Sequence, residues 1–263
     1  MVRKMRKFIY VLSFILIFCS IFSLTACKEK EKEPEPETTA STHATKAETS
    51  EAVKIVDIPE KIEDRVEMLN SALDYIDVYC YAFTKNTKCT VSNLNLGGLS
   101  KASNAGDAFR SIFGEKEVSY DYSYVSAPES FDENVISERF SADDAVSADA
   151  KQDGDTVTVT VTLKDEYNPD EKNGLLAKLS SDYLNAEKVK SSLGEFSSSA
   201  DSVNVSARDI KVKAELRAED SKLKKLEISY TENFSLSNVK LVQLEGSAVS
   251  GTSKTVVTYS KFS

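Results

Sequence analysis

The chain has 263 residues, a net charge of −9 and a single histidine, His43. An acidic chain has no electrostatic basis for binding nucleic acid, so no nucleic-acid partner is expected. Because one histidine cannot supply a catalytic triad and a histidine-ligated metal site, and no glycine-rich phosphate loop is present, no cofactor or metal is expected.

The N-terminal segment has the layout of a secretory signal. An apolar run from residue 8 to residue 22 is followed by small residues and a cysteine. Four basic residues precede this run: Arg3, Lys4, Arg6 and Lys7. The run is shorter than the roughly 20 residues that span a bilayer, which argues against the alternative of a transmembrane anchor. Residues 1–26 are therefore expected to be removed as a signal peptide.

The sequence Leu24-Thr25-Ala26-Cys27 resembles the lipobox of bacterial lipoproteins. The resemblance implies that Cys27 carries a diacylglycerol and becomes the new N-terminus, which anchors the protein to the membrane on its extracytoplasmic face. Residues 27–56 are rich in Lys, Glu, Pro, Ser and Thr and have little to bury, so they are expected to form a disordered tether. This tether is similar to those of Gram-positive lipoproteins, which favours a Gram-positive cell membrane.

Residues 57–263 are expected to form a single domain, since they are numerous enough for one core. Its first element is predicted to be a helix of about 25 residues, because apolar residues recur every three or four positions. These residues are Ile62, Val66, Leu69, Leu73, Ile76, Cys80 and Phe83. We expect the stripe to pack against a sheet rather than to form a partner-binding coiled coil, because no second such helix is present.

Two further helices are predicted, at residues 100–113 and 170–184. Gly114 ends the first of them, and Gly174 weakens the second. A short helical turn is expected at residues 186–193.

The remaining elements are predicted to be strands. Residues 156–163 alternate Thr with Val or Leu, and Asp153-Gly154 before them favours a hairpin with residues 145–151. Shorter alternating runs predict strands at residues 118–124, 210–216, 226–230, 234–244 and 255–262. Because each strand has one polar face, a doubly wound parallel fold is disfavoured. We expect an α+β fold in which a curved antiparallel meander packs against two or three helices.

Three groups of residues are candidates for chemistry. Residues 165–171 concentrate acidic side chains, which could bind calcium or act as a carboxylate pair, although Asn168-Pro169-Asp170 is more typical of a turn before a helix. Tyr120, Tyr122 and Tyr124 share one strand face and could line a ligand groove or simply cover the sheet.

Cys80 and Cys89 are the two cysteines of the folded domain. A chain reversal between the predicted helix and the next strand could bring them close enough for a disulfide in the oxidising exported compartment. Two buried free thiols are the alternative.

The leading functional hypothesis is a non-enzymatic, membrane-anchored extracytoplasmic lipoprotein. It could bind a lipid-like or other apolar ligand, or an envelope protein, and its element order loosely resembles that of periplasmic lipoprotein carriers. A solute-binding lipoprotein of a transporter would need two lobes of alternating strands and helices. A carboxylate-dependent envelope hydrolase would need two acids that converge in a cleft.

Overall fold

The computed structural model describes residues 55–101, 104–136, 138–169, 174–241 and 244–263. Residues 51–263 form one compact unit by their contacts. The signal sequence, Cys27 and nearly all of the expected tether lie outside the described residues, as do Asp170 and Glu171 of the acidic segment.

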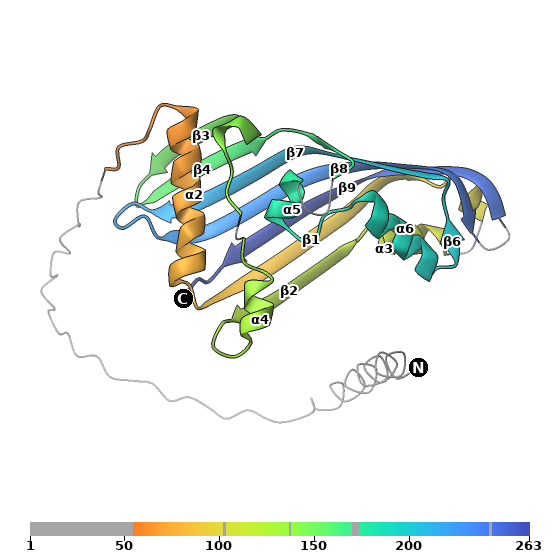
Figure 1. Cartoon of the computed structure of the whole chain (residues 1–263), viewed down its shortest axis with the longest axis horizontal. Helices are drawn as coiled ribbons and strands as arrows, with labels where there is room; N and C mark the ends of the chain where they lie inside the picture. Colours follow the sequence, from red (N-terminus) through yellow and green to blue (C-terminus); the bar gives the residue numbers. More distant parts are fainter. Residues whose placement is uncertain (1–54, 102–103, 137, 170–173, 242–243) are drawn as a thin grey trace, which may run out of the picture. The chain divides into compact units, whose positions relative to one another are not determined.

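A nine-stranded antiparallel sheet forms the body of the domain (Figure 1). The strands are β1 (Ala82–Asn95), β2 (Lys116–Ser123), β3 (Ala145–Asp153), β4 (Thr156–Leu163), β5 (Glu166–Tyr167), β6 (Ser198–Ser199), β7 (Ser202–Arg217), β8 (Leu223–Leu241) and β9 (Leu244–Ser260). Their order across the sheet is β2-β1-β9-β8-β7-β4-β3, with β5 on β7 and β6 on β8. An antiparallel sheet combined with helices confirms the predicted α+β class.

The predicted hairpin between β3 and β4 is confirmed. Asp153 pairs with Thr156, and Gly154 between them has a φ of 55°, a conformation that glycine adopts without strain. The strands do not follow one another across the sheet in chain order at β1, because β1 pairs with β2 on one side and with the C-terminal strand β9 on the other.

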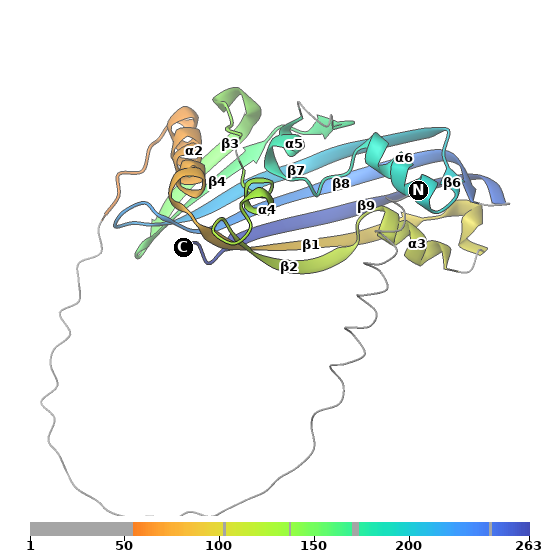
Figure 2. The same ribbon diagram turned by 60° about the horizontal axis from the view of Figure 1, so that its bottom comes forward.

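The described residues contain five α-helices and two short 3-10 helices. These are α2 (Ile62–Tyr79), α3 (Ala105–Ile112), α4 (Pro128–Asp132), α5 (Leu175–Leu179), α6 (Ala186–Glu195), η1 (Gly97–Lys101) and η2 (Ala142–Asp144). Figure 1 shows α2, α5 and α6 in front of the same face of the sheet, and Figure 2 shows the domain after rotation. The apolar stripe of α2 is buried, as predicted, against residues of the sheet.

The first predicted helix is too long. The helix ends at Tyr79, and Cys80 and Phe83 belong to an extended segment in which every second side chain from Phe83 to Val91 is buried. The helix predicted at residues 170–184 is also too long at its end: within the described residues 174–184 only Leu175–Leu179 is helical, and Ser180 is extended.

Apolar side chains on one sheet face form two separate cores. The first core lies under α2 and α5 and includes Ile228 and Val257, whereas the second core lies against α3 and α6 and includes Phe234 and Val249. The long strands β1, β7, β8 and β9 run through both cores. At the second core Gly251 allows close approach, because a Cβ there would lie 2.6 Å from the Phe234 ring.

Candidate functional site

A row of polar residues separates the two cores on the inner face of the sheet. This row, here called the polar seam, consists of Lys85, Thr87 and Cys89 on β1, Ser253 and Thr255 on β9, and Glu232 on β8. Strand register places Thr255 beside Cys89 on one side and Tyr230 on the other. All six side chains are buried, so each must find a partner or remain unsatisfied at a free-energy cost.

Asp182, in the segment between α5 and α6, forms ion pairs with Lys85 of the seam and with Lys116 on β2. Its carboxylate lies 2.6 Å from the Nζ of Lys116 and 3.2 Å from the Nζ of Lys85, and it accepts a hydrogen bond of 3.3 Å from the Thr87 hydroxyl. Lys85 is only 5% exposed and also donates to the Oδ1 of Asn134 at 3.1 Å. Burial acts to raise the pKa of Asp182, but the two lysines together hold that pKa below its ordinary value.

Glu232 lies at the centre of the seam with 0% of its surface exposed. Its Oε1 accepts a hydrogen bond of 2.6 Å from the Leu184 backbone N–H, whereas its Oε2 makes no hydrogen bond within the described residues. Burial raises the pKa of Glu232 to about 8, against the opposing effects of this hydrogen bond and the Lys188 charge. The side chain is therefore mainly protonated at neutral pH.

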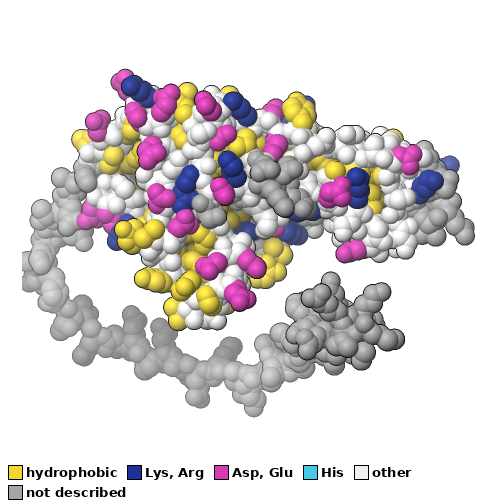
Figure 3. Space-filling view, in the orientation of Figure 1, with side chains coloured by type: hydrophobic (Ala, Val, Ile, Leu, Met, Phe, Trp, Pro, Cys, Tyr) yellow, Lys and Arg dark blue, Asp and Glu magenta, His cyan; other side chains and the backbone are white. Residues whose placement is uncertain are grey.

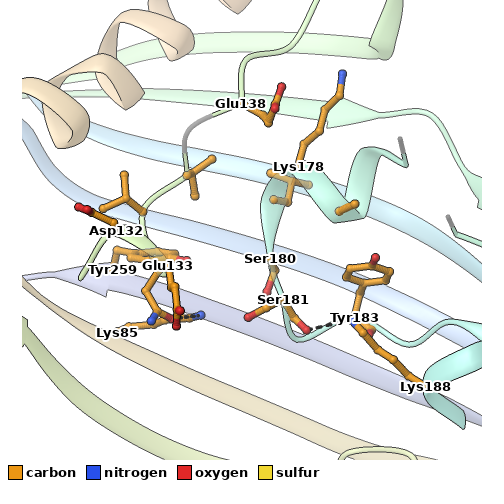
Figure 4. A pocket seen from close by; sticks show the side chains of 15 residues that line it. Lys85, Asp132, Glu133, Glu138, Lys178, Ser180, Ser181, Tyr183, Lys188 and Tyr259 are labelled. Carbon is orange, nitrogen blue, oxygen red and sulfur yellow. Dashed lines mark hydrogen bonds between the residues drawn. The ribbon is translucent and has the colours of Figure 1, made fainter. Parts of the chain in front are cut away.

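A cleft opens beside the seam, with a volume of about 410 Å³. Figure 4 shows one wall formed by the segment that carries Asp132, Glu133 and Glu138, and an opposite wall that carries Lys178, Ser180, Ser181 and Tyr183. Lys85 on β1 and Tyr259 on β9 form its floor. This volume falls within the range of small-molecule sites, roughly 300–1,000 Å³. The lining is charged and polar as well as apolar.

The three tyrosines singled out in the sequence do not line this cleft. Tyr122 is half-buried, with its ring centroid 5.3 Å from that of Phe83, and it therefore contributes to the first core. Tyr120 and Tyr124 are 57% and 48% exposed.

Tyr120 and Tyr124 belong instead to an exposed cluster, here called the aromatic patch. It extends from the end of α2 and the start of β1, where the Tyr124 N–H donates to the Tyr81 carbonyl at 2.8 Å, along β2 as far as Tyr120. Its members are Val78, Tyr79, Tyr81, Tyr120, Tyr124 and Val125, each at least 48% exposed. Figure 3 shows hydrophobic side chains gathered over this part of the molecule, around the lower end of α2 and α4.

The structure does not join Cys80 and Cys89, and both thiols are free and buried. The expected chain reversal is absent, because β1 begins at Ala82 and runs through Cys89 without a turn. The strand from Ala82 to Cys89 alone spans roughly 23 Å at about 3.3 Å per residue, far beyond the Cα separation of about 7 Å that a disulfide tolerates. Burial raises the pKa of both thiols, which favours their protonated form.

Where the acidic segment is described, it forms strand β5 and a bend at Asn168, and its side chains bond to neighbouring backbone groups. The Oε2 of Glu166 accepts the Leu176 N–H at 3.1 Å, and the side chain of Asn168 accepts the Val205 N–H at 3.0 Å. No group of three or more His, Cys, Asp or Glu side chains suited to a metal occurs among the described residues. The described side chains of the segment therefore have structural roles, whereas the predicted turn at Asn168-Pro169-Asp170 lies partly outside the described residues.

Sequence reasoning missed the polar seam and the cleft. The available signal was a charged residue at a position where strand alternation requires an apolar one, namely Lys85 and Glu232.

Within the described part of the chain, no helix is both long and apolar enough to cross a membrane. No protein-family model matches the chain, and neither the curated proteins nor the solved structures yielded a match.

Proposed function

We propose that the protein is a non-enzymatic lipoprotein, tethered to the outer face of the cell membrane through Cys27, which binds another envelope protein through the aromatic patch. The observation that carries the proposal is a group of five exposed tyrosine and valine side chains where the end of α2, the start of β1 and the end of β2 meet, with a sixth, Tyr120, further along β2. Contiguous exposed apolar surface is typical of interaction sites, and tyrosine is enriched at protein interfaces.

The position of the patch beside an edge strand supports a protein partner. β2 is the last strand of the sheet on its side, so it presents backbone groups that no other described strand pairs. An extended segment of a partner could add to this edge while its side chains pack on Tyr120 and Tyr124. Since the chain carries a net charge of −9, a basic partner surface would be steered toward it.

A lipid-like ligand is the second candidate, and the structure offers it less support. An acyl chain needs a mainly apolar cavity, whereas the 410 Å³ cleft is lined by three lysines and three acids among its fifteen residues.

We further propose that the sheet curves as a meander around its helices, which would keep the aromatic patch at an outer edge of the domain.

An envelope hydrolase is also less well supported. The three acids of the cleft come from a single wall, and the facing wall supplies lysine and serine side chains (Figure 4). A two-carboxylate mechanism requires acids on both sides of the scissile bond.

Site-specific photocrosslinking in cells tests the proposed interface. A photoreactive phenylalanine analogue at Tyr79 or Tyr124 should give a discrete protein adduct, because these side chains would lie inside the interface. Tyr167 provides a matched control, because it lies outside the patch, on β5, and its exposed fraction of 69% is close to the 65% of Tyr79.

The adduct at Tyr79 should disappear when Tyr81 and Tyr124 are both replaced by Ser, and it should persist in Tyr167→Ser. If patch positions gave no protein adduct, or gave only lipid adducts, the patch would not be a protein-docking surface.

The membrane tether has its own test. Replacing Cys27 with Ala should abolish incorporation of labelled fatty acid and leave unprocessed precursor, because no thiol remains to accept the lipid. Gel mobility and fatty-acid labelling measure both effects, and Cys19→Ala serves as the control within the signal sequence. Labelled Cys27→Ala protein would contradict the lipobox interpretation.

A further inference from the structure

We infer that the cleft over Lys85 and Tyr259 is a binding site for a small zwitterion of the amino-acid or short-peptide class. This site is separate from the aromatic patch, since none of the patch residues lines it. The inference comes from how charge is distributed across the cleft, and it does not depend on the proposed docking function.

The two walls carry opposite charge. Asp132, Glu133 and Glu138 lie on one wall, and Lys178 lies on the other (Figure 4). None of these four side chains makes an ion pair with another described residue. In Figure 4 the side chains of Glu138 and Lys178 both extend away from Lys85 and Tyr259. Two oppositely charged walls held apart across a gap favour a molecule that carries both charges.

The floor is polar and held in place. Lys85 is more than nine-tenths buried, and Asp182 and Asn134 fix its ammonium group, which lies 5.8 Å from the centroid of the Tyr259 ring. Because Asp182 already compensates the charge of Lys85, the floor of the cleft does not require a ligand with a net negative charge. Ser180 and Ser181 add hydroxyl groups beside it.

The apolar part of the lining gives room for a side chain. Val135, Ile136 and Leu179 lie among the charged residues of the cleft. An ammonium group would face the acidic wall, a carboxylate would face Lys178, and an aliphatic or aromatic side chain would contact these apolar residues. A free dipeptide combines all three features within a volume of about 410 Å³.

Calorimetric titration of the full chain in mild detergent tests this assignment. The probes are a panel of free dipeptides with aliphatic, aromatic and hydroxyl side chains, each compared with its N-acetylated form, its C-terminal amide and its doubly capped form. At least one free dipeptide should bind saturably, and loss of either charge should weaken its binding about tenfold, the usual value of one charge-assisted hydrogen bond.

Variants of the walls assign each charge. Lys178→Met should weaken the free dipeptide about threefold, as for a partly exposed charge contact, and leave the C-terminal amide unaffected. The triple variant Asp132→Asn, Glu133→Gln and Glu138→Gln should weaken the free dipeptide and leave the N-acetylated form unaffected. Lys151→Met, an exposed lysine on β3, is the matched control.

Absence of saturable binding for every free dipeptide at millimolar concentration would overturn the proposal. Equal affinity for free and doubly capped forms would also overturn it, as would a Lys178→Met variant that weakened all forms alike.

Discussion

Replacing Asp182 with Ala should destabilise the domain by roughly 3–5 kcal/mol, because it leaves a buried ammonium group without its carboxylate. Lys85 is 5% exposed and would retain the Asn134 amide oxygen at 3.1 Å and the Tyr259 ring, whose centroid is 5.8 Å away, but no anionic partner among the described residues. The free-energy cost of losing the carboxylate should be smaller for Lys116, because its side chain is 38% exposed and can be hydrated. Urea unfolding followed by circular dichroism, at a pH near neutrality, measures the change.

Two further variants separate the buried charge from a general loss of contacts. Lys85→Met combined with Asp182→Ala should be less destabilising than Asp182→Ala alone, because the uncompensated charge is gone. Glu187→Ala removes an exposed ion pair with Lys190 and should cost less than about 1 kcal/mol. A double variant that is at least as destabilised as Asp182→Ala alone would contradict the role of the uncompensated Lys85 charge.

Asp182 also gives a pH dependence at acid pH. Its pKa in the folded state lies below the ordinary value of 3.8. The stabilisation is therefore fully present above that ordinary value, and it is lost as the pH falls through the lowered folded pKa.

The buried polar residues also explain why the sequence does not predict strand β1. Residues 82–95 form one strand, yet their inward side chains are Phe83, Lys85, Thr87, Cys89 and Val91. Lys85 and Thr87, polar residues at two of these five positions, hide the alternation, because this part of the strand belongs to the polar seam. Phe83 also continues the three-and-four spacing of α2, so the sequence assigns it to the helix.

For β7 and β8 the sequence predicts only parts of strands that are continuous in the structure. The β8 strand is continuous from Leu223 to Leu241, but the sequence predicts two strands that are interrupted at Glu232. In β7 a bulge at Asp209, with a φ of 53°, moves the buried positions from odd to even numbers. Only the half after the bulge is recognised in the sequence, since one inserted residue reverses which face is buried.

The elements that the sequence predicts well are those whose buried face is wholly apolar. The α2 stripe from Val66 to Ile76 and the β4 alternation from Val157 to Leu163 are both of this kind. The candidate site is less predictable, because its residues come from distant segments. Lys85 and Asp182 meet only after β1 pairs with β9 and the α5–α6 segment folds over the sheet.

Replacing Glu232 with Gln should make the domain more stable than the wild type at pH 8 and little different at pH 4.5. In the folded wild type the buried carboxyl has a pKa of about 8, compared with an ordinary value of 4.5. Between these two values the unfolded chain is ionised while the folded chain holds its proton. The free energy of unfolding therefore falls as the pH rises, by about 1.4 kcal/mol for each pH unit from this group.

Gln cannot ionise, and its amide oxygen can still accept the Leu184 N–H that Glu232 accepts at 2.6 Å. The difference in unfolding free energy between Glu232→Gln and wild type should thus grow on the order of 4 kcal/mol across this window and stay constant above it. Urea unfolding at several pH values measures the difference, and other titrating groups cancel in the comparison. Glu227→Gln is the matched control, since Glu227 lies on the same strand but is partly exposed and paired with Lys225. A pH-independent difference for Glu232→Gln would mean that Glu232 is ionised within the folded domain. In that case the polar seam would hold a buried charge, compensated by groups other than the Leu184 N–H.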